Sequence, residues 1–208
     1  MFIDFETIDD RTAYRWMGST IVPRPVAWVS TLSADGRPNL APFSFFQMIT
    51  AKPPTLMFCP LVQNDGTMKD SARNIQETGE FVVNLVPFAQ VNGMNETSFS
   101  LPPGESEFDA AVIASLASHK VAPRRVAGVP VSFECTLAQF NPYPADQPSC
   151  FMILGRVVAA HIDERVLDEA GYVDPAKLDL VARMGGDWYA RINSPDNFKL
   201  KRPDGWQK

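Results

Sequence analysis

The sequence predicts a mainly β fold, an antiparallel barrel with helices at its periphery. Six segments combine β-branched, aromatic and other apolar residues over lengths typical of strands. Most of the 18 prolines fall singly between apolar runs, which indicates short strands joined by rigid turns. Strands and helices do not alternate regularly, so a doubly wound parallel sheet is disfavoured.

The N-terminal third predicts a short helix followed by a hairpin. A helix is expected over residues 7–17, with Thr7 as its N-cap and Gly18 at its end. A strand over 26–32 and a turn over 33–36 follow, in which Gly36 supplies a positive φ. The return segment, 39–49, is apolar but contains Pro42, which cannot donate to a central ladder. We therefore expect a strand interrupted by a bulge or a bend.

The next segment predicts a strand, a helix and another strand. The strand over 55–59 is set off by prolines on both sides, and the strand over 80–86 is rich in β-branched residues. Between them a helix is expected to begin at Asp70 or Ser71 and to run through Thr78. Gly79 stands where a C-terminal glycine cap belongs.

Residues 87–208 predict three parts: an insertion over 87–118 that covers the barrel, a pair of strands within 131–162, and a C-terminal extension from residue 163. Helices are expected over 88–94 and 108–116, with a loop over 100–105 between them. Strands over 131–140 and 150–162 should pair across a turn-rich connection. Short helices are expected over 163–167 and 175–184, and an irregular tail from Gly185. We interpret residues 1–208 as one domain, with a core over 20–162 and a C-terminal extension over 163–208.

Composition excludes several classes of function. The net charge of −5 provides no positive field to gather a nucleic acid. No apolar run approaches the roughly 20 residues that span a bilayer, and the first residues are acidic where a secretory signal is basic. A cytoplasmic location and no membrane partner are expected. The three cysteines are an odd number without a C-x-x-C pair, which favours reduced core thiols.

The polar segment over 64–74 has the features of a phosphate site. It brings Lys69, the hydroxyl of Ser71 and free backbone N–H groups to one helix start. A phosphate needs several donors and one or two cations, which this arrangement supplies. A solvated, capped helix is the alternative interpretation of the same residues.

A second candidate surface lies on the first hairpin. Residues 30–32 and 41–46 place small and hydroxylated side chains beside aromatic ones. Such a surface suits a flat ring with apolar faces and a polar edge. Ordinary core aromatics of a barrel would produce the same pattern.

Five blocks stand in a distinctive order and spacing over roughly residues 20–86, and one motif follows later. The blocks are Pro23–Thr31, Asn39–Phe46, Pro53–Phe58, Lys69–Ile75 and Glu80–Asn84, and the later motif is Arg183–Tyr189. Together they resemble a known family, the flavin-reductase-like and flavoredoxin-like FMN-binding proteins.

The resemblance implies an antiparallel split β-barrel that forms a homodimer, with FMN near the interface. The ring would lie along 30–32 and 41–45, and the phosphate would lie near Lys69. NAD(P)H is implied as a possible electron donor, and free flavin, a small molecule or a redox partner protein as the acceptor. The candidate cofactor-binding residues are Arg24, Ser30, Thr31, Leu32, Ala41, Pro42, Phe43, Ser44, Phe45, Asn64, Lys69, Asp70, Ser71, Asn74 and Tyr189.

Two departures from the family pattern bear on function. Ser71 stands where threonine is more common, which keeps the hydroxyl. The reductase branch carries a histidine before the paired glycines of the later motif, where this chain has Arg183 and Met184. One hypothesis is therefore an NAD(P)H-dependent flavin oxidoreductase, and a second is an FMN-binding electron carrier without its own NAD(P)H chemistry. A barrel that binds another phosphorylated ligand is a third.

No side chain is expected to act as a catalyst, because in flavin chemistry the cofactor itself carries the reaction. His119 and His161 have no carboxylate partner identifiable in the sequence and are interpreted as structural or exposed. No cluster of His, Cys, Asp or Glu has the spacing of metal ligands, so no metal is expected.

Overall fold

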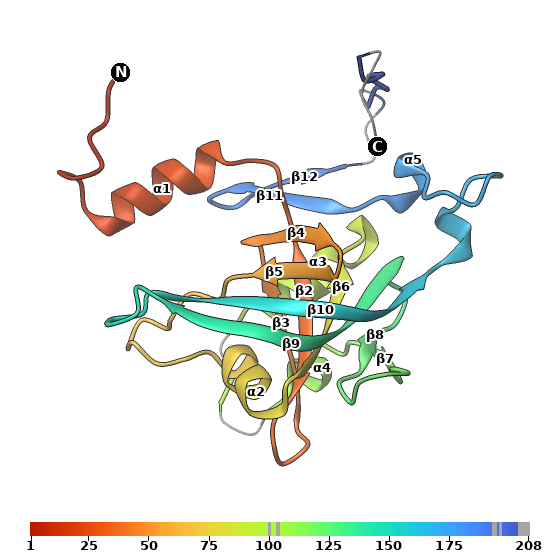
Figure 1. The fold of residues 1–208 in the computed structure, drawn as a ribbon, viewed down its shortest axis with the longest axis horizontal. Coiled ribbons are helices and arrows are strands. Elements are labelled where there is room, and N and C mark those ends of the chain that lie inside the picture. The colour runs from red at the N-terminus through yellow and green to blue at the C-terminus, as the bar shows by residue number, and fades with distance from the viewer. Residues whose placement is uncertain (100, 103–104, 193–194, 196, 204–208) are drawn as a thin grey trace.

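The computed structural model describes residues 1–99, 101–102, 105–192, 195 and 197–203. Its main feature is a seven-stranded antiparallel sheet in the order β3-β2-β6-β9-β10-β5-β4 (Figure 1). The strands are β2 (Ala27–Leu32), β3 (Pro38–Phe43), β4 (Phe46–Ala51), β5 (Pro54–Phe58), β6 (Glu80–Leu85), β9 (Val131–Tyr143) and β10 (Cys150–Ile162). The predicted antiparallel architecture is confirmed.

The two edge strands of this sheet are consecutive in the sequence. β3 and β4 occupy opposite ends of the strand order, yet only Ser44 and Phe45 separate them. The sheet must therefore curl until its edges meet at this link, which is how a sheet becomes a barrel. The carbonyl of Phe45 accepts from Cys59 N at 2.8 Å and ties the link to the end of β5. The interruption predicted within 39–49 is this change of strand.

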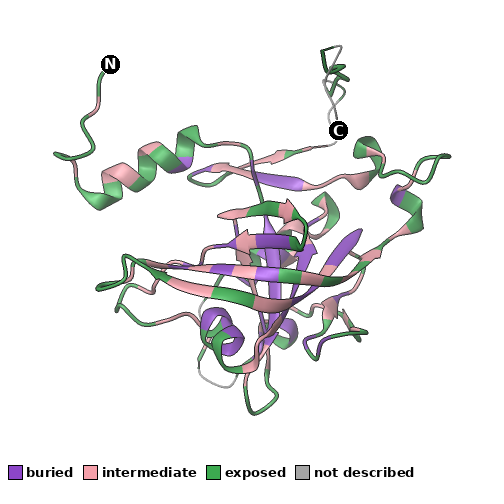
Figure 2. Ribbon diagram, viewed as in Figure 1, coloured by how far each residue is buried: buried purple, intermediate pink, exposed green. Residues whose placement is uncertain are grey.

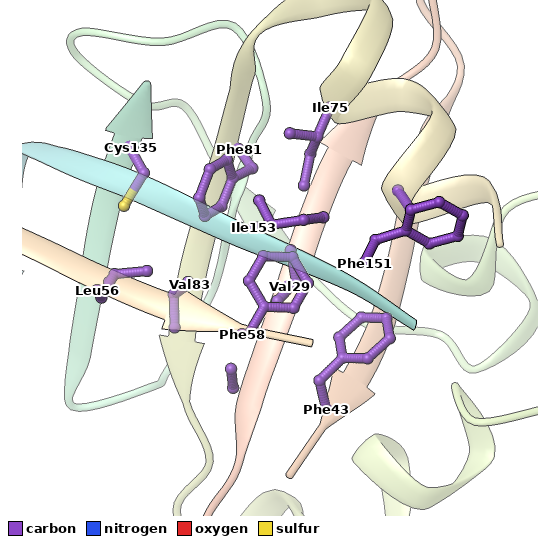
Figure 3. Packing of buried hydrophobic residues seen from close by; sticks show 12 residues of the cluster. Val29, Phe43, Leu56, Phe58, Ile75, Phe81, Val83, Cys135, Phe151 and Ile153 are labelled. Carbon is purple, nitrogen blue, oxygen red and sulfur yellow. The ribbon is translucent and has the colours of Figure 1, made fainter. Parts of the chain in front are cut away.

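The barrel interior holds the larger hydrophobic cluster. Side chains from different strands meet there, as Figure 3 shows, and Figure 2 shows that buried residues occur along the central strands and on α2. Phe58 lies 5.1 Å from Phe43 and 5.6 Å from Phe81 between ring centroids. Ala72 and Ile75 of α2 (Asp70–Thr78) also belong to this cluster, so the helix is packed against the barrel by its apolar face. Gly79 ends α2 with a φ of 73°, as predicted.

A smaller cluster lies around Trp28 and fixes the covering segment. Trp28 is fully buried and its indole N–H donates to Thr97 Oγ1 at 2.8 Å. Met94 of α3 (Val91–Glu96) and Phe108 of α4 (Glu107–Ala110) pack in the same cluster. The described parts of the segment over 87–118 thus cover β2 and β3, in agreement with the covering insertion expected there.

Smaller elements complete the described structure. A three-stranded sheet has the order β1-β11-β12, and β7 pairs with β8. No helix in the described part of the chain is both long and apolar enough to cross a membrane. The bounds are α1 (Asp10–Thr20), β1 (Arg24–Pro25), η1 (Phe88–Gln90), β7 (Ser115–Leu116), β8 (Arg125–Val126), η2 (Glu164–Val166), α5 (Pro175–Leu178), β11 (Val181–Gly185) and β12 (Trp188–Arg191).

Two helix predictions were wrong in extent. α1 begins at Asp10 because Asp9, not Thr7, accepts from Thr12 N at 2.8 Å, and it continues past Gly18. The helix expected over 108–116 is one turn, and a short strand follows it.

The C-terminal predictions were also wrong. The helix expected over 175–184 ends at Leu178, because Val181–Gly185 forms a strand that pairs with β1. The tail from Gly185 includes a second strand, β12, so it is not irregular throughout. Cross-strand pairing overrides weak helical propensity in both cases. The loop expected over 100–105 lies partly outside the described residues.

Gly155 on β10 permits the core to close at a break in the register of the β9–β10 ladder. A Cβ at this position would lie 2.2 Å from Phe81 Cζ and 3.2 Å from Cys135 Cβ. We predict that Gly155→Ala lowers the free energy of unfolding by about 1–3 kcal/mol, the usual cost of overpacking a core. Urea denaturation measures this. Gly18→Ala is the matched control, because no atom lies within 4 Å of the added carbon. Equal stability of the two variants would contradict the assignment.

Candidate functional site

A cavity of about 410 Å³ opens beside the start of α2. It is bounded by that helix, by the beginning of β3 and by the covering segment over 97–107. Five residues singled out in the sequence line it, namely Ala41, Lys69, Asp70, Ser71 and Asn74. The cavity thus coincides with the predicted phosphate site.

The helix start presents unused donors and positive charge to this cavity. Lys69 is the N-cap residue, and no side chain caps the first turn of α2. The first N–H groups of a helix have no partner within it, and they carry partial positive charge. Asp70 pairs with Arg73, whereas Lys69 has no ion-pair partner among the described residues. Its charge remains available to an anion.

Buried amides orient two buried hydroxyl groups, that of Ser71 in the cavity lining and that of Thr31 behind it in β2. Asn39 Nδ2 donates to Ser71 Oγ at 2.9 Å, and Asn74 Nδ2 donates to Thr31 Oγ1 at 3.0 Å. Ser71 is only 2% exposed. Because its oxygen already accepts from Asn39, the hydroxyl hydrogen is left to donate. Asn39 completes this site, and the sequence analysis did not single it out.

Two residues that the sequence analysis did not single out also line this cavity, Glu107 of the covering segment and Arg37 of the turn between β2 and β3. Glu107 Oε2 accepts from Leu40 N at 2.9 Å and joins α4 to β3. Burial raises the pKa of this carboxyl. Arg37 lines the same cavity and pairs with Asp35 at 2.8 Å. Neither Glu107 nor Arg37 belongs to a motif, so only the fold brings them to the site.

The candidate ring residues fall into two groups. Ser30 is fully buried and its hydroxyl donates to Arg124 O at 2.5 Å, while Phe43 packs in the barrel core. These side chains support the hairpin from within. The half-buried members are Leu32, Ala41, Pro42, Ser44 and Phe45.

Arg24 and Tyr189 lie at a second cavity or beside it, away from α2. Arg24 Nη1 donates to Gly18 O at 2.5 Å and to Ile21 O at 2.7 Å, which ties β1 to the end of α1. Arg24 lines the second cavity, of about 860 Å³, and the Tyr189 hydroxyl accepts from Arg183, which lines it too. Asn64 is exposed and lines neither cavity.

The two histidines lie at a buried carboxylate that the sequence did not identify. Glu134 is fully buried, and its Oε1 shares a hydrogen bond with His161 Nε2 at 2.5 Å. The backbone N–H groups of His119 and Lys120 donate to the same carboxylate at 2.8 and 2.5 Å. Burial raises the pKa of Glu134, but these hydrogen bonds outweigh it and lower the pKa overall. His161 therefore does have a carboxylate partner, and the cluster anchors a loop on β9.

The thiols are poorly suited to nucleophilic chemistry. Burial raises the pKa of Cys59 to about 11 and also raises the pKa values of Cys135 and Cys150. Cys135 is fully buried, but the other two are only partly so. Within the residues the structure describes, no three His, Cys, Asp or Glu side chains are grouped to hold a metal ion.

Comparison with known proteins finds a matching family model and two similar structures. Residues 17–178 match the family model described as a flavin reductase like domain. Nitrilotriacetate monooxygenase component B from Bacillus cereus is 31% identical, with a TM-score of 0.90 over 96% of this chain and 98% of that one. The 2-nitrobenzoate 2-nitroreductase NbaA of Pseudomonas fluorescens is 25% identical, with a TM-score of 0.86 over 100% and 99% of the two chains.

A third structure bears on the fold alone. It is a Shewanella frigidimarina protein described as having a split barrel domain. Its identity is 20% and its TM-score is 0.81, over 98% of each chain. The predicted split barrel is confirmed by this likeness and by the sheet order described above.

Proposed function

This chain belongs to the flavin reductase like family, and from that premise we propose that it is an FMN-binding oxidoreductase. In this proposal, reducing equivalents pass from NAD(P)H through the flavin to free flavin, a small acceptor or a partner protein. The observation that carries it is the cavity at the start of α2, where the helix has no side-chain cap and Lys69 has no ion-pair partner in the described part of the chain. The reductase named among the similar structures supports the reaction class.

The donor set at this cavity fits a phosphate monoester. Lys69 supplies a cation, Ser71 an oriented hydroxyl and the first turn of α2 its backbone N–H groups. Asn74 lines the same wall. These residues would hold the FMN phosphate, and Asp70, paired with Arg73, would contribute its backbone N–H rather than its carboxylate.

The hairpin edge would hold the ring. Leu32, Ala41, Pro42, Ser44 and Phe45 are half-buried, so they offer contact area without being committed to the core. Three buried side chains would not touch the ring but would hold in place the strands that carry this surface. They are Ser30, Thr31 and Phe43. Pro42 lacks an N–H, and β3 is an edge strand, which is where proline is tolerated.

The protein's part in the chemistry is to bind and orient. When bound, a flavin accepts a hydride from a nicotinamide and passes electrons onward, so no protein nucleophile is needed. The raised pKa values of the Cys59 and Cys150 thiols agree with a protein that supplies no nucleophile. Arg24 and Tyr189 would act beyond the ring, at the second cavity or beside it. Asn64, the last candidate, lines neither cavity and is given no part in this proposal.

A second candidate function is an FMN-binding electron carrier that does not react with NAD(P)H. It is favoured by Arg183 and Met184, which replace the histidine of the reductase branch. Arg183 donates hydrogen bonds to the Tyr189 hydroxyl and to Gly186 O. A partner protein would then reduce the flavin.

Anaerobic titration distinguishes the two functions. We predict that the purified protein, loaded with FMN, loses its visible flavin absorbance when NADH or NADPH is added. An absorbance that persists, with the flavin still reducible by dithionite, would support the carrier. A protein that does not retain FMN on gel filtration would contradict both.

Replacing Lys69 tests the phosphate site. Lys69→Ala should weaken FMN binding roughly 10- to 100-fold, because a charge-assisted hydrogen bond contributes about 1.5–3 kcal/mol. Fluorescence titration of FMN gives the affinity. Lys69→Arg should retain most of it, and Lys120→Ala, an exposed lysine outside the cavity, should retain all of it. An FMN affinity that is unchanged in Lys69→Ala would show that this lysine does not contact the phosphate.

Homodimerisation is part of the proposal. Large exposed apolar side chains gather on α1, β4 and β12, including Met17, Met48 and Trp188. Such side chains suit an interface between copies of the chain. Light scattering after gel filtration should give twice the 23.0 kDa chain mass. Met48→Glu should shift the protein toward monomer, and Tyr172→Glu, at another exposed aromatic, should not. A wild-type monomer would refute the proposal.

A further inference from the structure

Glu107 is a half-buried carboxylate in the wall of the cavity at the start of α2. It comes from α4, which lies at the same end of the barrel as α2 (Figure 1). The residue has no place in the donor set proposed for the phosphate. A charged carboxylate in the wall of an anion site repels the anion, so the protonation state of Glu107 affects what the cavity can bind.

The carboxylate also closes the free edge of β3. Its Oε2 accepts from Leu40 N at 2.9 Å. Because β3 is the last strand of the seven-stranded sheet, an N–H group on its outer side has no strand partner, and Glu107 satisfies this one. Leu40 follows Asn39, whose side-chain amide donates to Ser71 Oγ. Glu107 therefore holds the part of β3 that orients the Ser71 hydroxyl.

No cation in the described part of the chain pairs with this carboxylate. Two of the cations in the cavity wall are already paired, Arg37 with Asp35 and Arg73 with Asp70. Three cations and three anions line the cavity, namely Arg37, Lys69, Arg73, Asp70, Glu105 and Glu107. The unpaired groups are thus one lysine and two glutamates, which leaves an excess of negative charge when both acids are ionised.

The surroundings of Glu107 favour its protonated form. Burial raises the pKa of the carboxyl, the hydrogen bond from Leu40 N lowers it by less, and the charge of Asp70 raises it further. Glu96 of α3 lines an adjoining hollow together with Glu107 and adds another acid. β3, against which α4 packs, carries no ionisable side chain.

A bound phosphate would act on Glu107 in the same direction as burial does. A second negative charge nearby disfavours the ionised carboxylate, so the pKa of Glu107 is higher in the complex than in the free protein. A ligand that raises the pKa of an acid binds with uptake of a proton. Its affinity is greatest below the pKa of the free protein and falls as the pH rises toward the pKa of the complex.

We propose that Glu107 is a positioning residue that takes up a proton when the flavin phosphate enters this cavity, so that FMN affinity depends on pH. The protonated carboxyl keeps a carbonyl oxygen for Leu40 N, and its O–H becomes a donor toward the cavity. The inference rests on the proposed function, because FMN is the anion concerned. Glu107 thereby favours retention of FMN on acidification, opposing the loss of charge by the phosphate itself.

Calorimetric titration of the flavin-free protein with FMN measures the proton uptake. Each titration is repeated in two buffers that differ in enthalpy of ionisation, over a pH series from the carboxyl range to neutrality. The phosphate monoester has its second pKa at about 6 and releases protons when its dianion is bound, so uptake has the opposite sign. Riboflavin, which lacks the phosphate, should bind without this uptake.

Variants separate the titration of Glu107 from its hydrogen bond. Glu107→Gln keeps an acceptor for Leu40 N but cannot ionise, so at neutral pH it should bind FMN roughly 5-fold or more tighter than the wild type. This difference should shrink on acidification. Glu107→Ala also removes the acceptor and should bind FMN less tightly than Glu107→Gln. Glu77→Gln, at an exposed position of α2 outside the cavity, is the matched control and should behave as the wild type.

Proton uptake that is reduced in Glu107→Gln but not in Glu77→Gln supports the inference. Equal uptake in the wild type and Glu107→Gln, or equal FMN affinity at neutral pH, would overturn it. In the wild type alone, net proton release at every pH would also overturn it, because only the phosphate would then be titrating. FMN binding without proton uptake counts against this inference alone. A wild type that binds no FMN at any pH would contradict the proposed function and the inference with it.

Discussion

The two-residue link at Ser44 and Phe45 constrains the whole barrel. It joins strands that occupy opposite edges of a seven-stranded sheet, so the sheet cannot remain open. Closure then creates an interior where aromatic rings from three different strands meet. That closure requires glycine at position 155, because β10 passes so close to the Phe81 ring that a Cβ there would overlap it.

The position of α2 follows from the same interior. Its apolar residues pack into the barrel, and the buried polar residues Ser71 and Asn74 bond to β3 and β2 through Asn39 and Thr31. The body of the helix is thereby fixed, while its first turn is left without a cap beside a cavity. Packing that stabilises the fold thus leaves a donor-rich helix start beside the cavity, which is what the proposed phosphate site requires. At the opposite end of the molecule, Arg24 ties β1 to the end of α1 beside the second cavity.

The sequence predicted the strands well, because their signals are local. β-branched runs, bounding prolines and the glycines at 36 and 79 act within a few residues of themselves. Helix ends and the C-terminal segment were predicted less well. Residues 181–191 form strands because β11 pairs with β1 and β12 pairs with β11, and no local sequence pattern predicts the pairing with β1. Asp9 and not Thr7 caps α1, because Thr and Asp can both cap a helix and only the folded backbone brings Asp9 to within hydrogen-bond distance of Thr12 N.

By itself, the sequence determined the barrel class, the family and the lysine-bearing helix start, since each depends on residue types at fixed spacing. Only the tertiary structure decided which candidate residues share a cavity. It gathered Ala41, Lys69 and Ser71 at one site, turned Phe43 inward, and placed Arg24 opposite Arg183, about 160 residues away in the chain. It also paired His161 with Glu134. Contacts between distant segments depend on strand order and register, which the closure of the barrel sets and which no short motif records.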